Sequence, residues 1–403
     1  MNNCNLCGKT KLLPLLSLGD HPIAHRFLSN PGEKEYVHPV DVCFCENCGL
    51  IQIVNPIPPG KLYTNYNWLS SWKWNPHIPI LVKLIEQKFG VSKKMAKIVE
   101  VGCNDGNFLD ELRKEGYANL LGVEPSKDGR EASRQKGIKT IGSYFNKKTA
   151  SEIVKTQGRC DLFISRQMLE HIIDLREFQE ALSIVLRPGG YVLFEVPNFG
   201  LGLSSPDYSA IWEEHVNYFT LQTLKRFLFD AGVRVIHSET AVFSGEALIV
   251  LGEYVKPSKS KSFVEELETL RSKALAFRNR WPNLREEFIG FLKNYKEHGR
   301  KVAIYGAGCR ACSLVNYTGI APYLELCLDD QAEKQGKYLP GARIPILSGD
   351  ELERRSIDLC LLAVNAENEE AVIARHLKFQ ENGGKFASIH PPSKRLLPFL
   401  NYP

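Results

Sequence analysis

The sequence predicts an α/β protein whose central parallel sheet is covered by helices, with a small cysteine-rich module before it and a second, smaller α/β domain after it. Strand-like and helix-like segments alternate between residues 98 and 196, and the alternation resumes at residue 302. Two Cys-x-x-Cys pairs lie near the N-terminus. Since 403 residues are too many for one small core, we expect a module over 1–75, a central domain over 76–255, a helical connector over 256–299 and a C-terminal domain over 300–403.

The composition is that of an ordinary globular protein, with 43% hydrophobic and 24% charged residues. The net charge of +5 is mild and gives little support to nucleic-acid binding. No apolar run is long enough to span a bilayer, and the first residues do not form a secretory signal. We therefore expect a cytoplasmic protein with reduced thiols and no membrane partner. Clustered cysteines then indicate a metal site, whereas Cys160, Cys327 and Cys360 lie in apolar runs and are expected to be buried.

The two cysteine pairs predict a zinc site formed by Cys4, Cys7, Cys45 and Cys48. Each pair can direct two thiolates to one ion, and two pairs complete a tetrahedron. Four protein ligands leave no open position, so the zinc is expected to be structural, and Cys43 is not expected to be a ligand. Two alternatives remain: thiols that pair by chance, and a zinc ribbon that binds nucleic acid, although the segment between the pairs has no dense basic stripe.

The central domain opens with a candidate cofactor site. A strand over Ile98–Val101 runs into the glycine turn Gly102–Gly106, and a helix over Asn107–Lys114 follows. Glycines allow close approach of the backbone, and a helix N-terminus favours a carboxylate such as that of S-adenosylmethionine (SAM). Glu124 follows the next strand, where an acid can accept hydrogen bonds from a ribose. Asn104 replaces the middle glycine of the dinucleotide motif, which favours SAM over NAD. The predicted cofactor-binding residues are Glu100, Gly102, Asn104, Asp105, Gly106, Glu124, Pro125 and Gln167.

The remaining elements follow from periodicity and turn residues. A helix over Leu221–Ala231 should stop at Gly232, and the two short runs after it are close enough to form an antiparallel pair. Residues 256–299 are charged and helical and should form a connector or a helical hairpin. Ser348 and Glu351 have the spacing of a capping box. Further expected strands lie at Leu120–Val123, Cys160–Ile164, Tyr191–Val196, Val233–His237, Ala247–Leu251, Val302–Tyr305, Tyr323–Leu328, Ile357–Val364 and Lys385–Ile389, and a further helix at Leu175–Leu186.

Several motifs along almost the whole chain together resemble the sugar C-methyltransferases of deoxysugar biosynthesis, including those that act on nucleotide-linked 4-keto-6-deoxysugars. The resemblance implies a class I methyltransferase (Rossmann-like) core, an N-terminal zinc-binding module, a C-terminal Rossmann-like α/β domain, SAM as cofactor and a nucleotide-sugar substrate. It is carried by the cysteine pairs, Glu100–Gly106, Leu169-Glu-His171-Ile, Phe194-Glu-Val-Pro197, Glu213-Glu214-His215, Tyr305-Gly-Ala, Asp329 with Lys334-x-Gly336, and Pro340–Pro345.

The resemblance also implies chemistry. Methylation of carbon requires a carbanion equivalent, which a base produces by removing a proton next to a ketone to give an enolate. By resemblance His215 is the base, Glu214 orients it or contacts the sugar, and His171 donates a hydrogen bond to the developing oxyanion. Tyr66 is a further candidate donor. Glu170 either belongs to this site or closes a structural hydrogen bond.

Two departures from the family pattern bear on the acceptor. Trp212 and Trp68 stand where the family has tyrosine, and each change removes a hydroxyl donor. Gly306-Ala-Gly308-Cys-Arg310 could bind a sugar-nucleotide pyrophosphate or serve packing alone. The competing functions are methylation of oxygen or nitrogen on another small molecule, a zinc-module nucleic-acid-binding protein, and an NAD-dependent role of the C-terminal domain. The sequence does not predict an oligomeric state.

Overall fold

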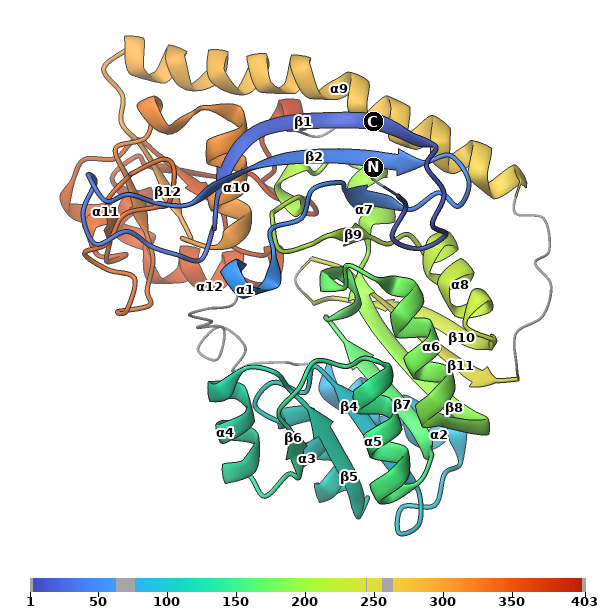
Figure 1. The fold of residues 1–403 in the computed structure, drawn as a ribbon. Coiled ribbons are helices and arrows are strands. Elements are labelled where there is room, and N and C mark those ends of the chain that lie inside the picture. Colours follow the sequence, from blue (N-terminus) through green and yellow to red (C-terminus); the bar gives the residue numbers. More distant parts are fainter. Residues whose placement is uncertain (1–2, 63–76, 244, 256–263, 401–403) are drawn as a thin grey trace.

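The computed structural model describes residues 3–62, 77–243, 245–255 and 264–400, which form three sheets joined by one long helix (Figure 1). The central sheet has seven strands in the order β10-β11-β8-β7-β4-β5-β6. Five of them run parallel, and β11 and β10 add an antiparallel pair at one edge, as the sequence predicts. The strands are β4 (Lys97–Val101), β5 (Asn119–Val123), β6 (Thr140–Ile141), β7 (Cys160–Arg166), β8 (Leu186–Pro197), β10 (Val233–Ala241) and β11 (Ala247–Tyr254).

Helices cover both faces of this sheet, as expected for alternating β and α segments. One face packs on α2 and α3, and the other packs on α5, α6 and α8. Gly232 follows α8 with a φ of +80°, which confirms the predicted stop. The helices of this domain are α2 (Ile78–Phe89), α3 (Asn107–Lys114), α4 (Lys127–Gln135), α5 (Lys147–Gln157), α6 (Leu175–Val185), α7 (Phe199–Ser204) and α8 (Leu221–Asp230).

The N-terminal region forms an antiparallel sheet that the sequence analysis did not anticipate. Its order is β1-β2-β3-β9, with β1 (Leu12–Pro22), β2 (Val37–Cys45) and β3 (Ile51–Ile53), followed by the short helix α1 (Pro59–Leu62). The last strand, β9 (Asn217–Tyr218), comes from the central part of the chain and pairs with β3. The N-terminal sheet is therefore hydrogen-bonded directly to the segment that contains His215.

The C-terminal region contains a parallel sheet in the order β14-β13-β12-β15-β16. Alternation of strands and helices predicts this arrangement, although β13 begins three residues later than expected. Its elements are β12 (Val302–Tyr305), α10 (Cys309–Thr318), β13 (Leu326–Leu328), β14 (Ile346–Leu347), α11 (Glu351–Arg354), β15 (Leu359–Leu362), α12 (Ala366–Arg375), α13 (Leu377–Glu381) and β16 (Lys385–Ser388).

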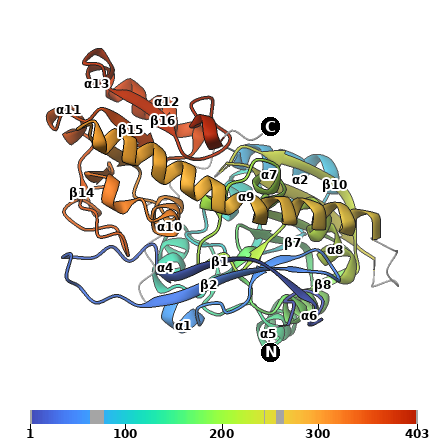
Figure 2. The same ribbon diagram turned by 90° about the horizontal axis from the view of Figure 1, so that it is seen from above.

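Two local predictions are corrected. The capping box is wrong because α11 has Asp350, not Ser348, at its N-cap, and Glu351 pairs instead with Arg354 and Arg355. The helical hairpin is also wrong, since the described connector is one helix, α9 (Val264–Glu297), which crosses above β1 and β2 (Figures 1 and 2). The apolar side of α9 shares a core with the N-terminal sheet and the C-terminal domain.

None of the helices in the described parts of the chain combines the length and the apolar character that crossing a bilayer requires.

Candidate active site and zinc site

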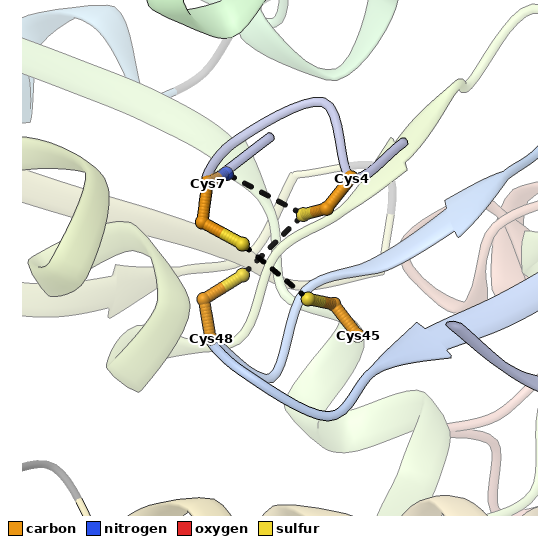
Figure 3. A group of neighbouring side chains, drawn as sticks. All are labelled: Cys4, Cys7, Cys45 and Cys48. Atoms are coloured by element: carbon orange, nitrogen blue, oxygen red, sulfur yellow. Dashed lines mark hydrogen bonds between the residues drawn. The ribbon is translucent and has the colours of Figure 1, made fainter. Parts of the chain in front are cut away.

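The four predicted zinc ligands converge at one end of the N-terminal sheet (Figure 3). Their sulfur atoms all lie within 4.8 Å of one another, with Cys4 and Cys48 3.4 Å apart and Cys7 and Cys45 3.5 Å apart. Tetrahedral Zn–S bonds of about 2.3 Å require sulfurs at this kind of spacing. Cys43 is not a member of the cluster, in agreement with the sequence analysis. Four thiols with this closed arrangement fit a structural zinc ion.

The glycine turn after β4 forms one wall of a cavity of about 360 Å³. Gly102 and Asn104 both adopt positive φ, at +72° and +47°, and the Gly102 amide donates to the Val123 carbonyl at 2.8 Å. Both Glu124 carboxylate oxygens accept backbone hydrogen bonds, from Asn104 at 3.0 Å and from Ser126 at 2.8 Å. The carboxylate is thereby fixed at the cavity wall, where it retains lone pairs for further donors.

The other predicted cofactor residues occupy distinct places around this cavity. Glu100, Asp105, Pro125 and Gln167 line it, whereas Gly106 is the N-cap residue of α3. Burial raises the pKa of Glu100 to about 8, so its carboxyl group is largely neutral near pH 7.

An ion network that sequence reasoning missed lies beside this cavity. The buried Glu195 carboxylate accepts hydrogen bonds from His77 Nε2 at 3.0 Å, Arg166 Nε at 2.8 Å and Gln167 Nε2 at 3.0 Å. Burial by itself would raise the pKa of Glu195, but Arg166 and His77 outweigh it and lower the pKa to about 2. The network therefore holds the Gln167 side chain, whose backbone has the strained φ of +47°.

A second cavity of about 310 Å³ lies next to the first and shares Gln167 and His171 with it. Its walls include Trp212 and His215 from the central domain and Arg310 from the start of α10. The two cavities thus meet at the carboxyl end of β7, and the second one extends to the C-terminal domain.

Two histidines face each other in the second cavity. The rings of His171 and His215 are edge to face with centroids 4.8 Å apart, and the Trp212 ring lies 3.8 Å from that of His215. His171 Nδ1 lies 3.0 Å from the Glu214 carbonyl oxygen. A carbonyl only accepts, so Nδ1 carries the proton and Nε2 is the basic nitrogen of the neutral ring. Burial lowers the pKa of both histidines, and the neighbouring His171 and Arg310 lower that of His215 further.

Three acidic side chains lie around this pair. The Glu214 carboxylate is 2.6 Å from His25 Nδ1, so His25 and not His215 is its hydrogen-bond partner. Glu213 accepts a hydrogen bond from the Ala24 amide at 2.7 Å. Both Glu170 carboxyl oxygens are buried without a hydrogen-bond partner among the described residues, which corrects the view that Glu170 closes a structural hydrogen bond. Burial raises the pKa of Glu170 to about 8.

Tyr66 and Trp68 lie outside the described residues. Arg310 does reach the second cavity, but it also pairs with Asp207 at 2.6 Å and bonds the Ser209 hydroxyl at 3.0 Å. This pair ties the C-terminal domain to the central domain at the cavity wall.

Comparisons with known proteins agree with this organisation. Three family models match: a zinc binding domain over residues 4–63, a methyltransferase domain over 77–238 and a C-methyltransferase C-terminal domain over 261–391. C-methyltransferase NovU of Streptomyces niveus is 29% identical over 405 residues, covering 96% of this chain and 94% of that protein.

Other relatives match a smaller share of the chain. The ubiquinone biosynthesis O-methyltransferase of Colwellia psychrerythraea is 29% identical over 124 residues, covering 30% of this chain and 49% of that protein. Among solved structures, geranyl diphosphate C-methyltransferase from Streptomyces coelicolor aligns with a TM-score of 0.35 at 10% identity, covering 44% of this chain and 78% of that one.

The chain belongs to the class I SAM-dependent methyltransferases. More particularly, it is a C-methyltransferase with an N-terminal zinc-binding domain and the C-terminal domain of that group.

Proposed function

We propose that this C-methyltransferase acts on a nucleotide-linked 4-keto-deoxysugar through an enolate intermediate. The observation that carries the proposal is the meeting of two cavities at Gln167 and His171. One cavity has the glycine turn and acidic residue of a nucleoside site, and the other has two neutral histidines. Methyl transfer requires such a junction, because the acceptor carbon must reach the methyl group in line with the bond that breaks.

The first cavity is assigned to SAM. Glu124 would accept hydrogen bonds from the two ribose hydroxyls, since both of its carboxylate oxygens are already oriented by backbone amides. Gly102, Asn104 and Asp105 would form the turn against the methionine portion, near the N-terminus of α3. Bound SAM supplies an electrophilic methyl group, which the acceptor carbon takes as the sulfur–methyl bond breaks.

The histidines are assigned to the acceptor. His215 removes the proton from the carbon next to the ketone, and the electron pair of that C–H bond forms the enolate. Its lowered pKa keeps it in the unprotonated form at neutral pH. The neutral His171 ring cannot donate from Nε2 to an enolate oxygen as the sequence analysis proposed, because its proton is on Nδ1. We assign it instead to accept a hydrogen bond from a sugar hydroxyl.

The nucleotide end of the substrate is assigned to the C-terminal domain. In open parallel sheets, ligands bind beyond the carboxyl ends of strands where the strand order reverses. In this sheet that point lies between β12 and β15, and Arg310 and Asn365, which follow these two strands, both line the second cavity. Arg310 is suited to a pyrophosphate. An NAD site in this domain is less favoured, since the Asp329 carboxylate accepts a hydrogen bond from the Ala307 amide and also pairs with the Lys334 ammonium group.

The test is incubation of the purified chain with ¹³C-methyl-labelled SAM and a panel of nucleotide-linked 4-ketosugars. We expect one product whose label is bonded to carbon next to the former ketone position, as located by NMR. A label on oxygen or nitrogen would refute the enolate mechanism and support methylation of oxygen or nitrogen instead. Absence of transfer together with salt-dependent RNA or DNA retention would favour the nucleic-acid alternative.

A further inference from the structure

The turn that carries His171 is held from behind by one buried side chain. This turn is a single 3-10 turn over Leu169–His171, which follows β7. The Asn217 side-chain amide donates to the Ile172 carbonyl at 2.7 Å and to the Leu169 carbonyl at 3.4 Å. Asn217 is 1% exposed, and it thus connects β9 to both ends of the turn.

The same side chain is bonded to the zinc-binding knuckle. Asn217 Oδ1 accepts a hydrogen bond of 3.0 Å from Asn5 Nδ2, and Asn5 lies between the ligands Cys4 and Cys7. The backbone amide of Asn5 donates to Gln52 Oε1 at 2.8 Å, and Gln52 is paired with Asn217 across β3 and β9. The position of Asn5 is therefore set on one side by the zinc ligands and on the other by the N-terminal sheet.

We propose that the zinc knuckle positions the His171 turn through the Asn5–Asn217 hydrogen bond. Asn5 and Asn217 are positioning residues, because they act by holding the turn that carries His171. The zinc ion then serves transfer as well as folding, although none of its ligands lines either cavity. The inference deepens the proposed function, since it rests on His171 being part of the acceptor site.

The physical basis is the sensitivity of transfer to geometry. A misplacement of about 1 Å in a reacting group can lower a rate by about 10²-fold. The carbonyls of Leu169 and Ile172 flank the two residues Glu170 and His171. Loss of their shared partner would allow the turn to shift without loss of the surrounding core.

The experiment compares Asn5→Ala, Asn217→Ala and the double variant in the full-length, zinc-loaded chain. The matched control is Glu46→Ala, because Glu46 holds the place in the second knuckle that Asn5 holds in the first. It is exposed, and its carboxylate lies near Arg271 of α9, at 3.5 Å. Zinc content, thermal unfolding, KM for each substrate, kcat and the imidazole ¹⁵N signals of His171 are measured for all.

We expect both single variants to retain zinc and KM for SAM, to lose about tenfold in kcat, and to shift the His171 signals. The double variant should be no slower than Asn217→Ala, because both changes interrupt one connection. Unchanged kcat and His171 signals, or additive losses, would overturn the inference. If Asn5→Ala loses zinc, the Asn217→Ala variant alone tests the inference, because it leaves both zinc knuckles unchanged. Shifted His171 signals with no methyl transfer even in the unmodified chain would refute the proposed reaction but not the positioning.

Discussion

The partnerless carboxyl group of Glu170 gives the sharpest physical prediction. Its two oxygens are buried and have no hydrogen-bond partner in the described parts of the chain. Burial raises its pKa from 4.5 to about 8. A raised acid pKa means that the folded state binds the proton more tightly than the unfolded chain does. The free energy of unfolding is therefore highest below pH 4.5, and it falls as the pH rises to the folded-state pKa. Between about pH 5 and pH 9 this linkage amounts to about 4 kcal/mol for the one group.

Glu170→Gln removes the titration while it preserves the shape of the side chain. We expect the free energy of unfolding of the unmodified chain to fall by about 4 kcal/mol more than that of the variant over that pH range. Urea unfolding at several pH values, followed by circular dichroism, measures this difference. Glu268→Gln serves as the control, because Glu268 is exposed on α9. Parallel pH curves for the unmodified chain and Glu170→Gln would refute the reasoning, since they would mean that Glu170 is ionised or partnered in the folded protein.

Three further outcomes concern the site and the metal. His215→Ala should lower methyl transfer by about 10²–10⁴-fold while calorimetry finds SAM affinity nearly unchanged; retained turnover would exclude it as the base. Because burial lowers the pKa of His215 well below 6.5, kcat/KM should stay level as the pH falls to about 6.5 and decline only at more acidic pH, where the base becomes protonated; a midpoint near pH 7 would contradict this. Cys45→Ser should release zinc and lower the thermal stability of the N-terminal domain, and unchanged metal content would disprove the ligand assignment.

The sequence predicts those parts of the site that consist of short, local patterns. The cysteine pairs, the glycine turn and Glu124 are each set by a few adjacent residues at the end of a strand or at a knuckle, so spacing alone is informative. The Glu195 network was missed because its members come from three separate segments, with His77 and Glu195 118 positions apart. The Asn5–Asn217 bond joins residues 212 positions apart. No periodicity encodes such pairs, and the roles of His215, Glu214 and Tyr66 remain predictions.

The neighbours of the segment 213–217 in the two flanking domains indicate what each domain contributes to the site. The N-terminal module holds Glu213, Glu214 and Asn217 through Ala24, His25 and Asn5. The C-terminal domain adds Arg310 to the same cavity, where its charge adds to the effect of burial in lowering the pKa of His215.

The cavity proposed for SAM, in contrast, is lined among the described residues by the central domain apart from Pro59. On the proposed assignment, cofactor binding depends mainly on the central fold, whereas the proposed acceptor site depends on all three domains. A methyltransferase of this construction can change its acceptor by changes in the flanking domains while its cofactor site stays the same.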